Sequence, residues 1–339
     1  MMIRDALEQF FKKQDLSHDQ MVAAMRMIMR GNVPPELIAG FLVGLQVKGY
    51  TVIEMTAAAE VMRELSSKVE VADKEKLVDT CGTGGDGTKT FNISTAASFV
   101  VAAAGGRVAK HGGRSVSSSS GSADVLEAVG ARIDLEPDQV SECLDEVGVG
   151  FMFAPAHHSA MKYAAPVRKT LGIKTLFNVL GPLTNPAGAK RQVMGVYDPT
   201  ILVKQAEVLQ NLGSSRAMIV HGDNGLDEIS PSGVTHVAEL YEGRISEYTV
   251  SVEDFGLIPV DLSTLSVDGV DEAAKMFRDS LSGGFEQGKT AVSLNAGAAL
   301  YVLGLCESLQ ESVGLARSVI ESGAALEKLE EFVAYSNTI

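Results

Sequence analysis

Two glycine- and hydroxyl-rich loops constrain this chain most, because each follows a short apolar run typical of a buried β-strand. The first reads DTCGTGGDGTKTFNIST from Asp79, and the second reads KHGGRSVSSSSGSAD and ends at Asp124. Glycine lets backbone amides approach an anion closely, and serine and threonine add donors without adding charge. The two loops together predict a cradle for a small molecule with several phosphate groups.

The first loop also has the G-x-G-x-x-G spacing of dinucleotide-binding folds, through Gly82, Gly84 and Gly87. Those folds carry an acidic residue about 20 positions later to bind the ribose, whereas this region holds Arg107 and Lys110. The Gly-Lys-Ser/Thr ending of a P-loop does not follow either. We therefore interpret the loop as a phosphate-binding loop of another kind.

The first 70 or so residues predict a helical unit without strands. Ser17 with Gln20, and Thr51 with Glu54, have the spacing of a capping box, and each pair precedes an apolar-periodic run. Two adjacent prolines, at 34 and 35, open a further helix. Four helices are expected in this unit.

From Leu77 onward, short apolar runs alternate with helical segments. Strands are expected at 77–81, 107–111, 149–154, 192–198 and 217–222, with a hairpin over 234–250. Helices are expected from Ser94, from a cap at Ser122, across AHHSAMKYAAPVRKTLG, and over 289–304 and 309–334. This alternation predicts a mostly parallel sheet covered by helices. The expected fold class is α/β, with a small all-helical domain and a larger α/β domain.

Length and charge narrow the classes of function. A chain of 339 residues exceeds what one core usually holds, which agrees with two domains. The formal charge of −14 and the absence of Trp argue against a nucleic-acid surface or binding to an anionic membrane. An acidic protein can bind a polyanion only through local positive potential, from amides, a few basic side chains and a metal ion. The three widely spaced cysteines predict neither a disulfide framework nor a zinc site.

The N-terminal sequence has the mixed-charge pattern of an amphipathic helix and lacks the apolar centre of a signal peptide. No apolar run approaches the roughly 20 residues that span a membrane. We therefore expect a soluble, cytoplasmic protein without a membrane partner.

Candidate ligand-binding residues lie where helices begin and strands end. In the segment NIST, Asn92 or Ser94 could serve only as a helix cap, or the same helix N-terminus could bind an anion. The hydroxyl of Ser94 could also bind a magnesium ion. In the second loop, Lys110, His111 and Arg114 follow a strand, at the edge where open α/β sheets bind ligands.

The loop GDNGLDEIS carries Asp223, Asp227 and Glu228. Such acidic loops are often simply solvated. Magnesium on a phosphorylated ligand, however, takes only one or two protein carboxylates and keeps several waters. Asp227 and Glu228 are therefore our candidate magnesium ligands.

A third basic segment contains two histidines and an arginine. His157 and His158 do not predict a metal site, because no further His or Cys follows at ligand spacing. Arg168 follows Pro166 and is expected near a helix kink or end. A guanidinium there could bind a substrate carboxylate through two hydrogen bonds.

Together these motifs resemble the anthranilate phosphoribosyltransferase family of tryptophan biosynthesis. The matching pieces, in order, are DTCGTGGDG, FNIST, KHGxRSVSSxSGSAD, HHxAMKYAxPVRxxLGxxTxFNxLGPLxNPA and GxxGxDEIS. The resemblance implies a homodimer with a nucleoside phosphorylase/phosphoribosyltransferase-like fold. It implies an enzyme that joins anthranilate to phosphoribosyl pyrophosphate and uses two Mg²⁺ ions. It implies a helical domain of residues 1–73 with a returning segment near 165–190, and an α/β domain of 74–164 and 191–339.

The resemblance also implies roles for the residues at matching positions. The implied phosphoribosyl pyrophosphate ligands are Gly82, Gly85, Asp86, Thr90, Asn92, Ser94, Thr95, Lys110, Ser118 and Ser122. The implied anthranilate site is Gly82, His111, Gly113 and Arg168, and the implied magnesium ligands are Ser94, Asp227 and Glu228. No residue is assigned as a general acid or base, so we expect catalysis by positioning and electrostatic stabilisation.

Two positions depart from the family pattern. Gly113 stands where the family commonly has an Asn that contacts anthranilate, and Ser119 stands where it commonly has a Lys. These changes bear on substrate affinity more than on the type of reaction. Three alternatives remain: an enzyme for another aromatic amine, a pyrimidine nucleoside phosphorylase, and a non-catalytic nucleic-acid-binding homologue. The phosphorylases are longer, and the nucleic-acid-binding homologue should be basic.

Overall fold

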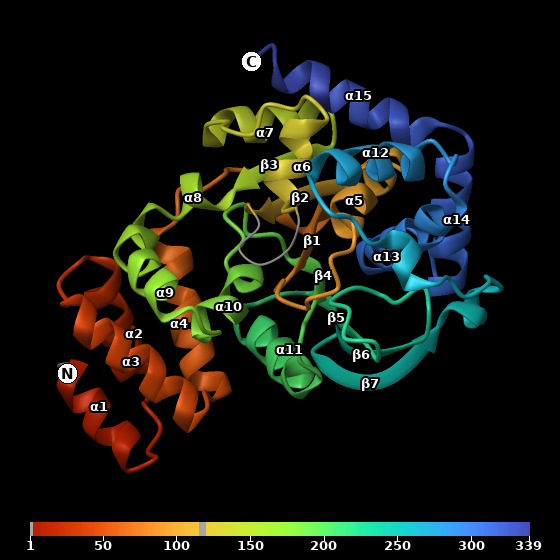
Figure 1. The fold of residues 1–339 in the computed structure, drawn as a ribbon. Helices are drawn as coiled ribbons and strands as arrows, with labels where there is room; N and C mark the ends of the chain where they lie inside the picture. Colours follow the sequence, from red (N-terminus) through yellow and green to blue (C-terminus); the bar gives the residue numbers. More distant parts are fainter. Residues whose placement is uncertain (1–2, 115–119) are drawn as a thin grey trace.

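The computed structural model describes residues 3–114 and 120–339. A group of N-terminal helices lies beside a larger part built around one sheet (Figure 1). Within the described residues, no helix is both long and apolar enough to cross a bilayer. The strands are β1 (Leu77–Gly82), β2 (Arg107–Gly112), β3 (Val149–Phe153), β4 (Arg191–Gly195), β5 (Arg216–Gly222), β6 (Val234–Tyr241) and β7 (Arg244–Ser251).

The helices confirm the predicted helical unit, including both capping boxes, at Ser17 and at Thr51. In the N-terminal part they are α1 (Ile3–Phe11), α2 (His18–Met29), α3 (Pro35–Lys48) and α4 (Val52–Leu65). Further along they are α5 (Ile93–Ala103), α6 (Ser122–Ala128), α7 (Pro137–Glu146), α8 (Ala154–His157), α9 (Ala165–Leu171), α10 (Leu176–Leu180) and α11 (Leu202–Asn211). The C-terminal helices are α12 (Val270–Leu281), α13 (Glu286–Leu303), α14 (Leu309–Glu321) and α15 (Ala324–Ser336).

The sheet has the order β3-β2-β1-β4-β5-β6-β7. Strands β1 to β5 pair in parallel, and β6 and β7 add an antiparallel hairpin, so the predicted mostly parallel sheet is confirmed. Gly82 at the end of β1 is in register with Gly195 at the end of β4. Since parallel strands end at one edge, the two glycine-rich loops leave from neighbouring strands on the same side of the sheet.

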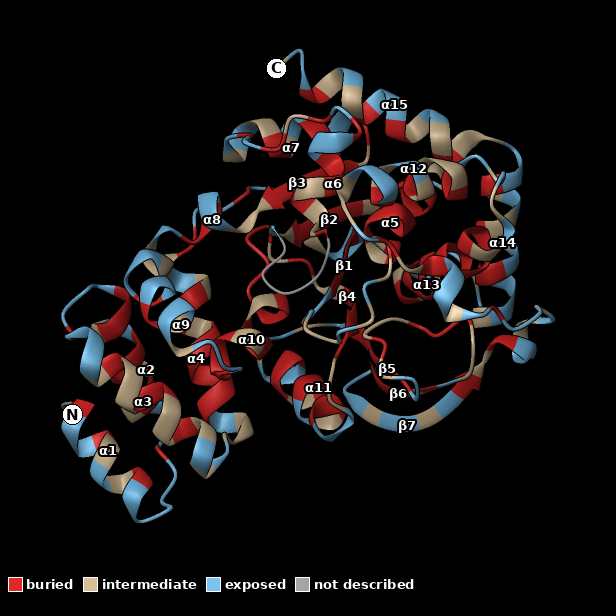
Figure 2. Ribbon diagram, in the orientation of Figure 1, coloured by how far each residue is buried: buried red, intermediate tan, exposed pale blue. Residues whose placement is uncertain are grey.

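Two hydrophobic clusters cover the two faces of the sheet. Neighbouring residues of β4, Val193 and Met194, belong to different clusters because side chains alternate along a strand. The cluster of Val193 includes α5 and α13, which Figure 2 shows as largely buried. The cluster of Met194 includes α11, α2–α4, α9 and α10. The helical part therefore shares a continuous core with one face of the sheet.

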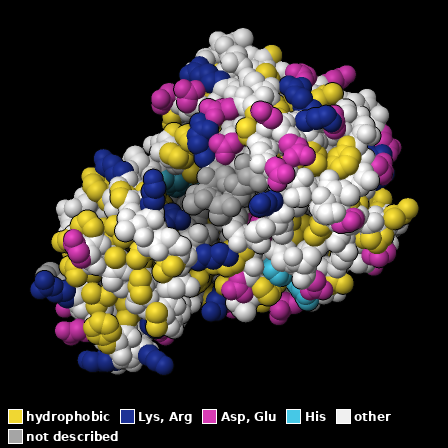
Figure 3. Space-filling view, in the orientation of Figure 1, with side chains coloured by type: hydrophobic (Ala, Val, Ile, Leu, Met, Phe, Trp, Pro, Cys, Tyr) yellow, Lys and Arg dark blue, Asp and Glu magenta, His cyan; other side chains and the backbone are white. Residues whose placement is uncertain are grey.

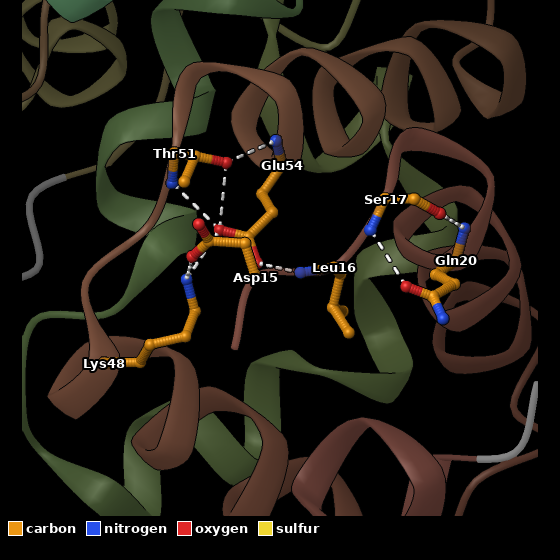
Figure 4. A network of polar contacts seen from close by, with 7 residues as sticks. All are labelled: Asp15, Leu16, Ser17, Gln20, Lys48, Thr51 and Glu54. Carbon is orange, nitrogen blue, oxygen red and sulfur yellow. Dashed lines mark hydrogen bonds and ion pairs between the residues drawn. The ribbon is translucent and has the colours of Figure 1, made fainter. Parts of the chain in front are cut away.

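A buried carboxylate ties the N-terminal helices together (Figure 4). Glu54 has no exposed surface and accepts hydrogen bonds from the backbone N–H groups of Leu16 and Thr51, both at 2.9 Å. The ammonium of Lys48 lies 2.9 Å from Glu54 and 2.6 Å from Asp15. Removing one partner of a buried ion pair costs about 3–5 kcal/mol. The network therefore fixes how α3 and α4 pack on the α1–α2 linker.

The sequence predicted one helix across AHHSAMKYAAPVRKTLG, and this prediction is wrong. The segment forms α8, a 3-10 turn at Ser159–Tyr163, and α9. His158 interrupts it with φ −116° and ψ 56°, outside the helical region. Pro166 lacks the N–H that a continuous helix would need, and so starts a new helix instead.

Two further helix predictions need correction. The helix expected over 309–334 is two helices, α14 and α15, because Gly323 between them has φ +84°. The cap of α6 is Gly121, whose N–H donates to Asp124 at 2.8 Å, and not Ser122. Ser122 is the first residue of this helix, and its hydroxyl faces another partner, described below.

Candidate active site

Glycines shape the loop that follows β1. Gly84, Gly85 and Gly87 have φ of +64°, +76° and +77°, a conformation that other residues adopt only with strain. The N–H of Gly84 donates to Asp227 Oδ2 at 2.8 Å. The loop thus turns without bulky side chains, next to the acidic residue that the sequence singled out.

The later part of this loop carries two more of the predicted ligands. The carboxylate of Asp86 accepts hydrogen bonds from the hydroxyl and the N–H of Thr88. Thr90 pairs with Ser266 in an isolated antiparallel bridge. These contacts fix the part of the loop that follows Gly85 and carries Asp86 and Thr90.

Glycines at the ends of β1 and β4 allow the acidic loop to come close. A Cβ atom on Gly195 would lie 1.5 Å from the backbone oxygen of Asp227, and one on Gly82 would lie 2.5 Å from Asp227 Oδ2. Neither position can hold a larger residue without displacing Asp227. The two strands therefore need glycine for packing, apart from any contact with a ligand.

Burial makes the acidic pair costly to ionise. Burial raises the pKa of Asp227 well above its usual range, and the negative charges of Asp86 and Glu228 raise it further. Burial also raises the pKa of Glu228 to about 7, against the opposing effect of the Lys110 ammonium. A bound cation would relieve both costs.

The N-terminus of α5 lies against this acidic pair. The N–H of Ser94 donates to Glu228 Oε1 at 3.1 Å. Asn92 occupies the cap position, but its side chain makes no capping bond. Its amide instead exchanges two hydrogen bonds with Ser120, both at 3.1 Å. Asn92 therefore joins the helix start to the second loop.

The described ends of the second loop are tied to α5 and α6. The hydroxyl of Thr95 donates to Ser122 Oγ at 3.0 Å, which connects α5 to α6. Arg114 forms an ion pair with Asp124 at 3.0 Å and also pairs with Glu127, so its charge is largely engaged on α6. The predicted ligand Ser118 lies outside the described residues.

Lys110 is the buried basic residue at this site. It is 2% exposed, and its ammonium donates to the backbone oxygen of Thr80 and lies 3.4 Å from Ser94 Oγ. Burial lowers its pKa, and the negative charge of Asp79 acts in the opposite direction. Lys110 thus provides local positive charge directly beside α5 and the acidic pair.

Asp79 and Asn185 form a buried support under the second strand. Asp79 has no exposed surface, and burial raises its pKa. It accepts from the N–H of His111 at 3.2 Å and from Asn185 Nδ2 at 2.8 Å. Asn185 also donates to the backbone oxygen of Ala109 at 2.8 Å. These contacts fix the backbone that carries Lys110 and His111.

One of the predicted anthranilate residues, His111, packs against a second histidine ring, that of His158. The rings of His111 and His158 lie 5.0 Å apart, and within the described part of the chain their Nε2 atoms are buried without a hydrogen-bond partner. Burial lowers the pKa of both, that of His158 to about 4. Each ring therefore has one nitrogen atom whose hydrogen-bonding capacity the described residues leave unused.

Arg168 and Gly113 have different surroundings. The guanidinium of Arg168 lies 5.4 Å from the ring centre of Phe177, and burial lowers its pKa. Among the described residues, no hydrogen bond joins Arg168 to His111. Among the described residues, a Cβ atom on Gly113 would meet only Ala154, at 3.9 Å.

The residues fit a magnesium ion bound together with a phosphorylated ligand. Among residues 3–114 and 120–339, no three acidic, His or Cys side chains converge into a cage that could hold a metal alone. Asp227 and Glu228 are nevertheless adjacent, half-buried and costly to ionise, and magnesium commonly takes one or two carboxylates plus substrate phosphates. Such a site would be complete only with the ligand present.

Sequence reasoning missed three residues that position the site: Asn185, Asp79 and Lys174. Lys174 donates from its ammonium to the backbone oxygen of Gly85 at 2.8 Å. Asn185 and Asp79 both lie within segments recognised as motifs, but neither had an assigned role. No local pattern marks Lys174, because its partner is 89 residues away.

Comparison with known proteins identifies the relatives. The family models that match are the helical bundle domain of the glycosyl transferase family, over residues 4–66, and its a/b domain, over residues 74–326. An anthranilate phosphoribosyltransferase from Leptothrix cholodnii is 54% identical over 334 residues, which are 98% of this chain and 97% of that protein.

Solved structures agree. Anthranilate phosphoribosyltransferase from Thermus thermophilus superposes with a TM-score of 0.93 at 42% identity, covering 98% of this chain and 100% of its own. The Saccharomyces cerevisiae enzyme in complex with PRPP and Mg has a TM-score of 0.91 at 26% identity, covering 99% and 98%. The same yeast enzyme with 4-fluoroanthranilate has a TM-score of 0.88 at 25% identity, covering 100% and 99%. On this sequence identity and full-length coverage, the chain belongs to the anthranilate phosphoribosyltransferase family.

Proposed function

We propose that this chain transfers the phosphoribosyl group of phosphoribosyl pyrophosphate to the amine of anthranilate. The products are N-(5-phosphoribosyl)anthranilate and pyrophosphate, in a step of tryptophan biosynthesis. The half-buried Asp227–Glu228 pair, packed against the glycine loop beside Lys110, carries this proposal. The yeast relative, solved with PRPP and Mg and with 4-fluoroanthranilate, supports the choice of substrates.

We assign the residue roles as follows. The phosphoribosyl donor is bound by Gly82, Gly85, Asp86, Thr90, Asn92, Ser94, Thr95, Lys110, Ser118 and Ser122. Anthranilate is bound by Gly82, His111, Gly113 and Arg168. Two magnesium ions are held by Ser94, Asp227 and Glu228 together with the donor.

The proposed chemistry depends on position and charge. Magnesium bound here would neutralise the negative charge that develops on the departing pyrophosphate. The ammonium of Lys110 is a hydrogen-bond donor held next to Ser94. The dipole at the N-terminus of α5 also favours an anion there. His111 is buried and its pKa is lowered, so it can orient the amine without taking up a proton strongly. Positioning by the two loops is then the main contribution.

We also propose the arrangement of the whole chain. The helical domain comprises residues 1–73 and the returning segment near 165–190, and the α/β domain comprises 74–164 and 191–339. The active form is a cytoplasmic homodimer. Apolar side chains gather on the helical part in Figure 3, and Phe11 and Val47 are 81% and 82% exposed, which supports a second copy as the partner there.

The test of the function is a fluorescence assay. Purified protein is mixed with phosphoribosyl pyrophosphate, magnesium and anthranilate, and we expect loss of anthranilate fluorescence only when donor and metal are both present. Asp227→Asn should lower turnover at limiting magnesium by roughly tenfold or more, because the metal contributes several kcal/mol of charge stabilisation.

Asp223→Asn is the matched control, since it changes a half-exposed acid of the same loop that pairs with His236. It should leave the magnesium dependence unchanged. If Asp227→Asn kept full activity with an unaltered magnesium requirement, the metal assignment would be wrong. If the native protein consumed no anthranilate but still bound the donor, the acceptor would be another aromatic amine.

A further inference from the structure

Lys174 connects the helical part of the molecule to the glycine loop. It lies in the short linker between α9 and α10, whose residues Val167 and Leu176 belong to the same core cluster as the N-terminal helices. Its ammonium donates to the backbone oxygen of Gly85 at 2.8 Å. It therefore reaches from one part of the molecule to the donor loop of the other.

A second contact holds the same ammonium. Lys174 Nζ lies 3.4 Å from the ring centre of Tyr197, a cation–π distance. Tyr197 is itself fixed to the base of the glycine loop, because its N–H donates to Thr83 Oγ1 at 3.1 Å. The ammonium thus lies between the aromatic ring and the loop carbonyl, and both belong to the α/β part.

The contact with Gly85 sets the direction of a neighbouring amide. The chain has no cis peptide bond among its described residues, and in a trans peptide the C=O and the following N–H point in opposite directions. When the carbonyl of Gly85 points to Lys174, the N–H of Asp86 therefore points away from the α9–α10 linker. Glycine loops lack side chains that would fix such a peptide, so this outside contact matters.

The linker connects two predicted substrate elements, one through the chain and one through a hydrogen bond. Arg168, which we assign to anthranilate, lies on α9 six positions before Lys174 in the chain. Gly85, which we assign to the donor, accepts from Lys174 directly. Any displacement of α9 on binding of the acceptor would move the ammonium that fixes the donor loop.

We propose that Lys174 is a positioning residue that couples acceptor binding at α9 to the conformation of the donor loop. This inference rests on the proposed function, and it adds a residue that touches neither substrate in our assignment. Coupling between two sites is reciprocal, so it can be measured as a change in the affinity for one ligand when the other is present.

The experiment measures anthranilate affinity by fluorescence titration, with and without magnesium and inorganic pyrophosphate, which cannot react with anthranilate. In the native protein we expect magnesium and pyrophosphate together to tighten anthranilate binding, so that the ratio of the affinities with and without them is roughly five or more. In Lys174→Met the ratio should fall to within about twofold of one. Lys174→Arg keeps a charged donor and should restore most of the ratio.

Lys169→Met is the matched control, because Lys169 is an exposed lysine of α9 whose side chain makes no hydrogen bond or ion pair within the described chain. It should keep the native ratio. A native ratio in Lys174→Met, or a ratio of one in the native protein, would overturn the inference even if the enzyme consumes anthranilate. A native protein that neither binds nor consumes anthranilate would instead show that the proposed function had failed.

Discussion

At the scale of single residues, Gly113 offers the most direct test of substrate preference. Its φ is not in the left-handed region, and within the part of the chain that the structure describes a Cβ atom there would have only Ala154 nearby, at 3.9 Å. Gly113→Asn should therefore fold normally. An added amide hydrogen bond contributes about 0.5–1.5 kcal/mol, so we expect KM for anthranilate to fall roughly two- to tenfold, with kcat little changed.

The neighbouring glycine provides the contrast. A Cβ atom on Gly112 would lie 3.1 Å from both Phe151 and Ser122, so Gly112→Asn should lower the melting temperature while Gly113→Asn should not. If Gly113→Asn raised KM for anthranilate or left it unchanged, the free space would not face the acceptor. In that case another aromatic amine would become the better candidate.

The buried histidines predict a dependence of stability on pH. The pKa of His158 is about 4 in the folded chain, against an ordinary value of 6.5. Between these values the unfolded chain binds a proton that the folded chain does not, so the unfolding free energy falls as the pH is lowered from 6.5. The loss is at most about 1.4 kcal/mol per pH unit for this group. Above pH 6.5 His158 contributes no pH dependence.

Chemical unfolding at several pH values between 7 and 4.5 would test this expectation. His158→Gln removes the titrating ring. The unfolding free energy of this variant should therefore fall less steeply as the pH is lowered, by the contribution of one titrating group. The lowered pKa values of His111 and His157 act in the same direction in both proteins, but His158 contributes to the lowering of the His111 pKa, so the variant removes that contribution as well. Equal slopes for the native protein and the variant would contradict the assignment.

At the scale of elements, the ends of β1 and β4 and the acidic loop form one packed unit. A Cβ on Gly195 would overlap the backbone of Asp227, which no rotation of a side chain can relieve. Overpacking costs about 1–3 kcal/mol, and here it would displace the acidic loop. Gly195→Ala should therefore weaken binding of the magnesium–donor complex by roughly fivefold or more in calorimetry.

Gly233→Ala serves as the control, because this glycine lies just after the same loop, has free space around it and has no left-handed φ. It should bind the donor normally. Native donor affinity in Gly195→Ala would show that the loop can move aside without loss of the site.

At the scale of the whole molecule, the proposed dimer can be tested through its exposed apolar residues. Phe11 and Val47 lie on α1 and α3 and are more than four-fifths exposed. Burying such residues would contribute about 1.5–3 kcal/mol each, so the double change Phe11→Lys and Val47→Lys should shift sedimentation from dimer toward monomer. Ile258→Lys changes an equally exposed residue of the α/β part and should leave the mass unaltered.

Much of this architecture could be predicted from the sequence because its signals are local. Capping boxes, strand–loop–helix patterns and the two glycine loops each occupy a few consecutive residues, and parallel strands bring their ends together without further information. Contacts between distant segments leave no such pattern. Asn185 with Asp79, and Lys174 with Gly85, are separated by 106 and 89 positions. The breaks at His158 and Gly323 also depend on backbone angles that apolar periodicity does not reveal.

The returning segment has a consequence for how the chain is made. α4 ends at Leu65, but α9, which completes the same core, begins only at Ala165. At a synthesis rate of about 5–20 residues per second, roughly 5–20 s separate the two. During that interval, on the ribosome, the apolar faces of α3 and α4 lack the helices that later pack with them. The N-terminal helices therefore remain without part of their core while the intervening chain is made.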